Sequence, residues 1–401
     1  MRIVFSVLTA VLLISCTKVN KKNTILLSRD THPTTVIAID PTQTPESFNL
    51  SEVADSAFII PLETRDECLI DGISWTQVTD DRIFISGGEN SLFPVYVFNK
   101  TGQFLNRIGV RGRGPGELIS PQGFTVDAAK KEVDLYDDAL RKHFIFDYNG
   151  VFLRDVKNNI YCVDHARVEG DINAYFSCFQ TNTPEADGNN YEVIVADKSG
   201  KRIGLAFPYT SDRYADGCIS IPFNFSSHNE SLYFFKTFND TIYSITPTSI
   251  SPRFIFDFGK YGAPKDIWTS KYSAEQRLKL SNDPNIISGP FDFIHVGNNL
   301  YFNFIYGRFG YTAFYNLSSG KLIASTIVEN DLNGLLLLDV VGNDDQYIYF
   351  SLRPNILKMY RDDLLNRGKT PSQQLSSLVE KYNESSNPLL LCIRMKDSPK
   401  I

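Results

Sequence analysis

A short aromatic strand pattern recurs six times along the chain, and this repetition constrains the fold more than any other feature. Aligned on Ile83 and its equivalents, successive copies are 50, 41, 58, 68 and 48 residues apart. Such spacing is typical of architectures built from repeated supersecondary units. The copies are RIFIS (82–86), EVDLYD (132–137), NAYFSC (173–178), SLYFFK (231–236), NLYFNF (299–304) and YIYFSL (347–352).

A hairpin follows most copies of this strand. An apolar strand, a polar turn with glycine and a second strand occupy 95–105, 143–153, 192–203 and 312–323, and TPTSIS (246–251) replaces the turn in the fourth unit. With one strand leading in, each unit supplies about four strands. Six four-stranded antiparallel units predict an all-β, six-bladed β-propeller. The 29 Phe and 20 Tyr agree with this, because aromatic residues favour strands.

Two segments interrupt the repeat, and the last unit lacks one strand. Residues at about 263–282 and 361–385 have apolar side chains at helical spacing, so we expect short helical insertions there. The final strand lies within 387–395, which leaves the sixth blade incomplete. The segment SAFIIPLE (56–63) is apolar enough to supply the missing strand. We therefore predict that strands from both chain ends close the ring.

The N-terminus has the pattern of an export signal. Residues 3–14 form an apolar run too short to span a bilayer, and the run ends in Leu13-Ile14-Ser15-Cys16, which resembles a bacterial lipobox. We predict a signal peptide at 1–15 and a lipid anchor on Cys16; the alternative is an ordinary secretory signal with a chance cysteine. Residues 16–45 are mostly polar and predict a flexible tether. The propeller then covers 46–401.

Charge and cysteine content narrow the possible partners. The net charge is −6, and no basic block occurs, so nucleic-acid binding is not expected. No CxxC motif is present, and no metal or cofactor is predicted. Among the remaining cysteines, Cys162–Cys178 is the most plausible disulfide, with buried free thiols as the alternative.

The first two units carry a family resemblance. GVRGRGPGELISPQGFTVD (109–127) followed by EVDLYDDALRKHFIFDYNGVFL (132–153) resembles an NHL-type repeat. Together with IPLETRDECLI (60–70), the arrangement is similar to the six-bladed β-propeller lipoproteins common in Bacteroides and relatives. The resemblance implies a binding scaffold more often than an enzyme, although some related propellers are lyases or lactonases with an axial metal. No acidic cluster follows Cys16, which by the same resemblance implies an outer-membrane lipoprotein that faces the periplasm.

The glycine-rich stretch IGVRGRGPGELISP (108–121) is the first candidate for chemistry. It lacks the residues of a Walker loop, and Glu117 stands where a dinucleotide fingerprint needs its third glycine. One interpretation is a crossover between two blades. The other is a local role in which Arg111, Arg113 and Glu117 reach toward a ligand at the mouth of the central pocket, since no other crossover repeats this sequence.

Histidines and surface aromatics supply the other candidates. His165 and His295 follow segments that we expect to be innermost strands, with Asp164 and Asp292 nearby. They are predicted to face the axis, either as polar filling of a wet channel or as acid–base or metal-binding groups. Arg308 lies in the hairpin turn Tyr306–Tyr311, whose aromatic side chains either stack on a ligand or pack inward.

The leading hypothesis is a non-catalytic envelope scaffold that binds a protein, peptide or glycan-derived ligand at its central or rim surface. The alternative is a metal-assisted lyase or hydrolase with its site at the axis. The enzyme alternative requires three or more of His165, His295, Asp164, Asp292 and nearby carboxylates to converge. The predicted ligand-binding residues are Arg111, Arg113, Glu117, His165, His295, Asp292 and Arg308.

Overall fold

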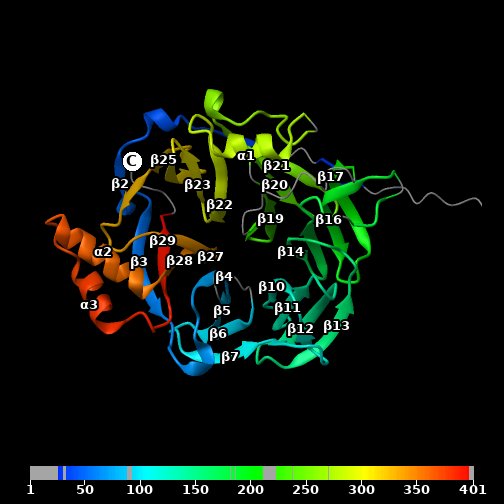
Figure 1. Ribbon diagram of the computed structural model, residues 1–401, viewed down its shortest axis with the longest axis horizontal. Coiled ribbons are helices and arrows are strands. Elements are labelled where there is room, and N and C mark those ends of the chain that lie inside the picture. Colours follow the sequence, from blue (N-terminus) through cyan, green and yellow to red (C-terminus); the bar gives the residue numbers. More distant parts are fainter. Residues whose placement is uncertain are drawn as a thin grey trace, which may run out of the picture.

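The computed structural model describes residues 26–29, 33–87, 93–180, 182–185, 187–210, 223–236, 238–269 and 271–396. Within them, six small sheets stand in a ring, each an antiparallel set of four strands (Figure 1). The protein is a six-bladed β-propeller, and the predicted fold class is confirmed.

Each blade begins with its innermost strand and proceeds outward. Blade one contains β4 (Ile73–Val78), β5 (Arg82–Gly87), β6 (Val95–Asn99) and β7 (Phe104–Ile108). Blade two contains β10 (Pro121–Asp127), β11 (Glu132–Asp137), β12 (Lys142–Asp147) and β13 (Phe152–Lys157). Blade three contains β14 (Asp164–Glu169), β15 (Ile172–Phe176), β16 (Asn190–Asp197) and β17 (Arg202–Tyr209). Blade four contains β18 (Phe225–His228), β19 (Ser231–Phe234), β20 (Thr241–Ile245) and β21 (Ile250–Asp257). Blade five contains β22 (Ser288–Val296), β23 (Asn299–Tyr306), β24 (Phe309–Asn316) and β25 (Leu322–Ser325). Blade six contains β27 (Asp339–Asn343), β28 (Tyr347–Leu352), β29 (Leu389–Met395) and β3 (Ala54–Pro61).

The repeated aromatic pattern is the second strand of each blade. This strand is covered on both faces, because each blade packs against two neighbours. In β5, for example, Ile83, Phe84 and Ile85 are all fully buried. The apolar clusters accordingly lie at the seams between blades: one joins Phe84 and Val97 of blade one to Leu135 of blade two. Burial on both faces explains why these strands are almost continuously apolar.

Strands from both chain ends close the ring, as predicted. Strand β3 pairs antiparallel with β29 from Pro61 opposite Leu389 to Ala54 opposite Met395. It forms the outermost strand of blade six and leaves no blade incomplete. The closure ties the start of the propeller to its final strand.

The prediction of a flexible tether is wrong for the described part of residues 33–45. Strand β1 (Thr35–Ala38) pairs parallel with β21 and adds a fifth strand to blade four. Ile37 and Ile39 are buried against this blade. Farther along, β2 (Ser47–Asn49) pairs parallel with β26 (Ile327–Glu329). The segment VIAI (36–39) is apolar enough to cover the open edge of β21, although its neighbours in the sequence are mostly polar.

Helices lie outside the ring. Helix α1 (Ala274–Ser281) belongs to the insertion between blades four and five, and α2 (Pro354–Asn366) and α3 (Gln373–Lys381) flank blade six (Figure 1). Helix α2 starts before the predicted insertion because Pro354 occupies its first turn, where a missing N–H costs nothing. Among the described residues, no helix has the length and apolar character needed to cross a membrane. Short 3₁₀ turns occupy Pro41–Gln43, Leu50–Glu52, Asp66–Cys68 and Gly259–Tyr261, and β8 (Val110–Arg111) and β9 (Glu117–Leu118) form a small parallel pair.

Candidate functional site

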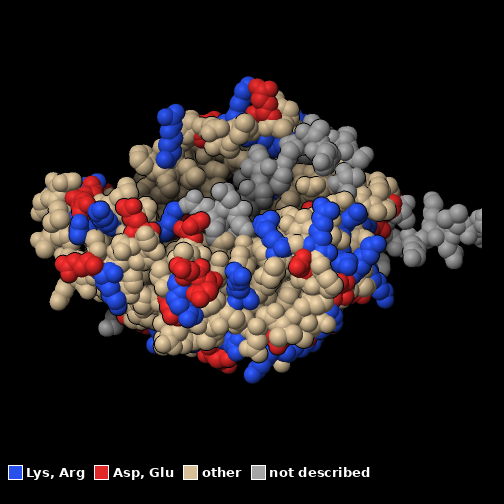
Figure 2. Space-filling model, turned by 60° about the horizontal axis from the view of Figure 1, so that its bottom comes forward, with Lys and Arg blue, Asp and Glu red and all other residues tan. Residues whose placement is uncertain are grey.

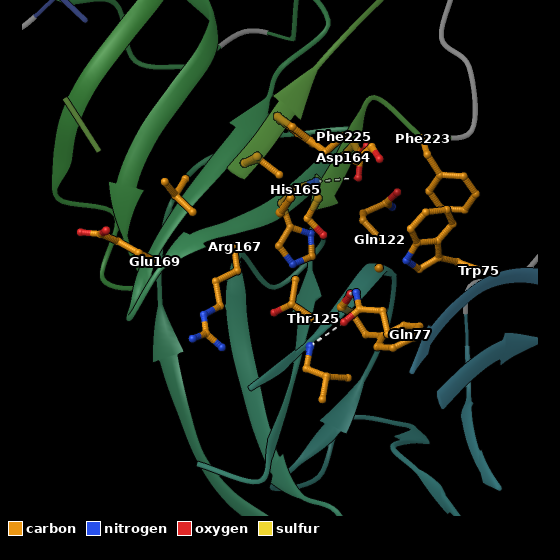
Figure 3. Close-up of a pocket in the computed structure, with 18 of the residues that line it drawn as sticks. Trp75, Gln77, Gln122, Thr125, Asp164, His165, Arg167, Glu169, Phe223 and Phe225 are labelled. Atoms are coloured by element: carbon orange, nitrogen blue, oxygen red, sulfur yellow. Dashed lines mark hydrogen bonds between the residues drawn. The ribbon is translucent and has the colours of Figure 1, made fainter. Parts of the chain in front are cut away.

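A cavity of about 560 Å³ lies between the innermost strands of blades one to four. The molecule is hollowed near the centre of the face in Figure 2, where basic and acidic side chains are interspersed around it. Strands β4, β10, β14 and β18 supply most of the cavity wall (Figure 3). We call this space the central cavity. Its labelled lining residues in Figure 3 are Trp75, Gln77, Gln122, Thr125, Asp164, His165, Arg167, Glu169, Phe223 and Phe225.

An aromatic pair stands at one end of the central cavity. Trp75 of β4 and Phe223, just before β18, have ring centroids 4.5 Å apart and planes inclined by 34°. Blades one and four are opposite each other in a ring of six, so this pair reaches across the axis (Figure 3). Gln122 lies beside the pair. The cavity therefore has an apolar end at which flat rings are presented.

Gln77 holds the wall of the cavity together. Its amide nitrogen donates to the carbonyl oxygen of Phe124 at 3.1 Å, and its amide oxygen accepts from the N–H of Val126 at 2.9 Å. Both polar ends of the side chain therefore bind the backbone of β10. This arrangement joins blade one to blade two. Gln122 is the more available amide, because its side chain makes a single hydrogen bond, from its nitrogen to the Ser120 hydroxyl at 3.3 Å.

Asp164 links blades three and four. Its carboxylate accepts from the backbone N–H of His165 at 2.8 Å and of Asn224 at 2.6 Å, and from that of Phe225. Burial raises the pKa of Asp164 to about 7, against these three N–H groups, which lower it. Because backbone donors already occupy the carboxylate, Asp164 is a structural link rather than a free acid or base.

His165 is a buried polar group on the cavity wall. The residue is only 5% exposed, and neither ring nitrogen has a hydrogen-bond partner among the described residues. Its ring packs against Tyr136 and Tyr175 at centroid distances of 5.4 and 6.2 Å. Burial lowers the pKa of His165 to about 3, so the imidazole is neutral at neutral pH. An unpaired buried imidazole is costly, which marks this wall as a place where a ligand or water would be accepted.

A hydrogen-bonded network lies behind His165, in the seam between blades two and three. His143 contacts the Asp134 carboxylate at 2.9 Å through Nδ1 and the Tyr175 hydroxyl at 2.8 Å through Nε2. The Lys198 ammonium lies 3.0 Å from the other Asp134 oxygen. Although burial opposes ionisation, the charge and hydrogen bond of His143, with Lys198, hold the pKa of Asp134 well below its usual range. None of these side chains lines the central cavity, so the network stabilises the seam.

Carboxylates stand at the other end of the cavity. Glu169, at the end of β14, and Glu230, after β18, are exposed and make no ion pair with any described residue. Arg167 lies between the two ends, and its guanidinium is 3.1 Å from the Asp127 carboxylate. This end is therefore acidic. The alternation of His165, Arg167 and Glu169 along β14 is a signal that could have indicated the cavity wall, although only His165 of the three was predicted.

The glycine-rich loop lies on the blade surface instead of in the central cavity. The Glu117 carboxylate accepts from the N–H of Gly114 at 2.7 Å and fills the space beside Gly112. Arg111 and Arg113 are exposed, and Arg111 donates weakly to the carbonyl oxygen of Ile119 at 3.4 Å. The loop is the crossover between blades one and two, with Glu117 holding its turn. The ligand contacts predicted for Arg111 and Arg113 stay predictions.

Asp137 fastens this crossover to blade two. Its Oδ2 accepts from the N–H groups of Ile119 and Ser120 at 2.6 and 2.9 Å. Gly109 and Gly116 adopt φ of 89° and 77°, in the region that favours glycine. These two turns explain why glycines are concentrated here.

His295 and Asp292 lie on β22, away from the central cavity. His295 packs against His228 of β18 with ring centroids 4.1 Å apart, accepts from the Tyr233 hydroxyl at 2.9 Å and donates to the Gly297 carbonyl oxygen at 3.1 Å. Burial lowers the pKa of His295 to about 4. Asp292 accepts from the Asn303 side chain at 3.0 Å, and burial raises its pKa.

The described residues do not converge on a metal site. They contain no group of three or more His, Cys, Asp or Glu side chains with the geometry to hold a metal ion. Of the residues named for the enzyme alternative, Asp164 and His165 line the central cavity, whereas His295 and Asp292 do not. The convergence on which a metal-assisted lyase or hydrolase would depend is therefore not found among these residues.

Arg308 is exposed at the tip of the hairpin between β23 and β24, with φ of 72°. The aromatic side chains of this hairpin divide between the two expected arrangements. Tyr306 packs on Tyr261 at 5.1 Å, and Tyr311 stacks on Phe304 at 4.8 Å, whereas Phe309 is 65% exposed. A rim contact by Arg308 stays a prediction.

The expected Cys162–Cys178 disulfide is wrong. Cys162 is a buried free thiol, as are Cys68 and Cys392. Cys178 is disulfide-bonded, and its partner lies outside the described residues. Cys162 lies just before β14, at the end of the crossover between blades two and three. Its small apolar side chain packs in the seam with Tyr136 and Ile160.

A second hollow, of about 660 Å³, lies on blade four beneath the insertion that carries α1. Trp268, Phe207 and Lys236 form part of its wall. The Lys236 ammonium is bound by both carboxylate oxygens of Glu192, at 3.0 and 2.9 Å, and lies 5.0 Å from the Trp268 ring centre. None of the predicted ligand-binding residues lines this hollow.

Comparison with solved structures shows the same architecture elsewhere. A Bacteroides fragilis protein described as a putative exported protein has 21% identity and a TM-score of 0.74, covering 90% of this chain and 100% of its own. A DUF4221 family member from Bacteroides vulgatus has 10% identity and a TM-score of 0.49, covering 86% of this chain and 98% of its own. A streptogramin B lyase has 10% identity and a TM-score of 0.38, covering 73% of this chain and 79% of its own. The first likeness shows the fold alone, and the other two carry no argument.

Comparison with protein families gives one match. A family model described as "Domain of unknown function (DUF4934)" matches residues 34–394. This range includes strand β1, which agrees with its place in the fold. No curated protein matches the sequence.

Proposed function

Since the chain belongs to the DUF4934 family, a family of unknown function, we propose that it is a non-catalytic binding protein of the bacterial envelope. In this proposal the central cavity holds a small protein-, peptide- or glycan-derived ligand. The observation that carries it is the composition of the cavity wall. An aromatic pair, a partly available amide, a neutral buried imidazole and carboxylates without ion-pair partners among the described residues face one space. A volume of about 560 Å³ is in the range of small-molecule sites.

The position in the cell is part of the same proposal. Cys16 would carry the lipid, and nine residues separate it from Leu26, which bridges to Leu205 on blade three. Fully extended, this stretch reaches roughly 35 Å. The propeller would thus be held close to the membrane at the edge of blades three and four. The exported relative from Bacteroides fragilis supports an envelope location, and the lipobox-like sequence supports an outer-membrane anchor.

The anchor is tested by labelling cells with a radioactive or alkyne-bearing fatty acid. The wild-type chain should incorporate the label and sediment with membranes, whereas a Cys16→Ser variant should do neither. Incorporation that is unchanged in the variant would contradict the anchor. Protease shaving of intact cells would then decide between the periplasmic and the outer face.

The binding role is tested with the chain from residue 17 onward, by screening envelope-derived peptides and glycans for a rise in melting temperature. A ligand present at 100 times its Kd should stabilise the protein by about 2.7 kcal/mol. Gln122→Ala should weaken the effect, because Gln122 lines the cavity. Gln103→Ala is the matched control, since Gln103 lies in an exposed hairpin turn, hydrogen-bonds with Asn99 and does not line the central cavity. Equal weakening by both substitutions would remove the cavity from the proposal.

A further inference from the structure

We infer that the central cavity recognises a neutral, hydroxyl-rich ligand, namely a short neutral oligosaccharide. This inference rests on the proposed binding function and assigns its ligand class. Three zones that the described residues form lead to it: an aromatic end, a wall without unpaired charge, and an acidic end. Each zone excludes a different class of competing ligand.

The aromatic end suits the apolar face of a sugar ring. Trp75 and Phe223 present large ring surfaces, and the indole of Trp75 also carries an N–H donor. Gln122 lies next to them and offers both a donor and an acceptor (Figure 3). A pyranose ring has this same combination: C–H groups on its face and hydroxyl groups at its edge. The Gln122 amide nitrogen already donates to the Ser120 hydroxyl at 3.3 Å, so a purely aliphatic ligand would leave only the amide oxygen and the second N–H without a ligand contact.

Among the described residues, the wall between the two ends carries no unpaired charge. Asp164 is occupied by backbone N–H groups, Arg167 by Asp127, and the imidazole of His165 is neutral. Thr125 adds a hydroxyl to this wall. An ionised ligand placed here would lose its water without gaining an opposite charge, which is costly. Neutral hydroxyl and amide groups lose less and find partners of both kinds.

The acidic end accepts hydroxyl groups and repels anions. Glu169 and Glu230 are carboxylates without ion-pair partners among the described residues, and each can accept from two hydroxyls. Their like charge raises the free energy of a bound anionic sugar or acidic peptide. Strand β14 runs from Asp164 to Glu169, so the two ends are roughly 17 Å apart at about 3.3 Å per residue. A ligand that touches both ends must therefore contain more than one ring.

Tryptophan fluorescence can test this inference, because the chain has only two tryptophans. Trp75 lines the central cavity and Trp268 lines the hollow on blade four. A Trp268→Phe variant reports only the central cavity, and a Trp75→Phe variant reports only the other. The probes are neutral gluco-, manno- and galacto-oligosaccharides of one to four rings, the corresponding hexuronic acids, and short neutral, acidic and basic peptides.

Neutral oligosaccharides should change the emission of the Trp268→Phe variant, with affinity rising from one ring to two or more. Hexuronic acids should bind at least about tenfold more weakly, as expected when an unpaired charge is buried. The double variant Glu169→Gln/Glu230→Gln should bind neutral oligosaccharides about tenfold or more weakly than the wild type. It should also show a smaller difference in affinity between neutral oligosaccharides and hexuronic acids. Glu275→Gln, on the remote exposed helix α1, is the control and should have no effect.

Other outcomes separate the inference from the proposed function. Binding of peptides or hexuronic acids at least as tight as that of neutral oligosaccharides would overturn the ligand class while preserving the binding role. Emission changes confined to the Trp75→Phe variant would overturn the assignment to the central cavity. If no probe changes the tryptophan emission, gives a heat of binding in calorimetry or raises the melting temperature, both the ligand class and the proposed function fail.

Discussion

The buried ion pair between Lys236 and Glu192 should show strong energetic coupling across the seam of blades three and four. Glu192 belongs to β16, and Lys236 lies two residues after the end of β19. Their side chains are only 7% and 10% exposed, and the ammonium contacts both carboxylate oxygens. Removing one partner leaves the other charge buried, so Glu192→Gln or Lys236→Met should each cost about 3–5 kcal/mol.

Removing both charges should cost much less than the sum of the two single substitutions. In the Glu192→Leu/Lys236→Met protein no charge stays buried, and such replacements are often neutral or stabilising. The double variant still loses the cation–π contacts of Lys236 with Trp268 at 5.0 Å and Phe207 at 5.7 Å. At roughly 0.5–2 kcal/mol each, these contacts set the expected cost of the double variant at a few kcal/mol or less. The coupling energy should therefore be several kcal/mol.

Urea unfolding at pH 7, followed by circular dichroism, gives the four free energies of a double-mutant cycle that uses Glu192→Leu and Lys236→Met as its single variants. The matched control is the Glu275–Lys279 pair on α1, whose 2.9 Å contact joins side chains that are 76% and 75% exposed. Its coupling should stay below about 0.5 kcal/mol. If the buried pair couples no more strongly than this exposed pair, burial is not what decides its energy and the reasoning fails.

Three further predictions follow from the closure, the buried histidines and the thiols. A chain that starts at Asp71 lacks β1, β2 and β3 and should lose more than about 5 kcal/mol, since the burial of Ile60 and Leu62 is lost and residues of β29 such as Leu390 become exposed; an unchanged melting temperature would refute ring closure. Burial lowers the pKa of His165 to about 3 and that of His295 to about 4, so between pH 6 and 5 each histidine binds close to one proton in the unfolded chain and almost none in the folded chain. Burial raises the pKa of Asp164 to about 7, so the folded chain binds close to one proton there that the unfolded chain does not, which partly cancels the effect of the histidines. These three groups together should therefore make stability fall by about 1 kcal/mol per pH unit on acidification over this window. His165→Phe should flatten this slope and Asp164→Asn should steepen it, and the opposite order in pH-dependent unfolding would contradict the assignment. Burial raises the pKa of the Cys162 and Cys392 thiols, so iodoacetamide at pH 8 should leave both unmodified in the native protein and react with both in urea, as mass spectrometry would show.

The number of blades and the order of strands within them were readable from the sequence because both depend on local chemistry. Six aromatic strands mark the second strand of each blade, where burial on both faces demands apolar residues in succession. Glycine turns mark the hairpins that follow. The missing strand of blade six was also identifiable, since SAFIIPLE (56–63) is an apolar segment without another partner. Local side-chain pattern and turn chemistry therefore sufficed for the propeller.

The candidate site was only partly predictable, because its residues come from different blades. His165 was named from its place on an innermost strand, but Trp75, Gln122, Glu169 and Glu230 were not. No sequence pattern says that Phe223 reaches Trp75 across the axis, since this contact depends on how blades one and four face each other. Likewise, His295 shares the local pattern of His165, yet it pairs with His228 in a different part of the ring.

The sequence by itself determined the six units, their strand order and the joining of both chain ends, since apolar period and turn residues act within each unit. Only the tertiary structure decided which polar residues share the central cavity and that VIAI (36–39) covers the edge of blade four. It also decided that the Glu117 carboxylate binds the backbone N–H of Gly114 within its own loop. These features depend on contacts between segments more than one hundred residues apart in some cases. The free energy of these contacts depends on how whole blades pack against one another, which no local sequence pattern encodes.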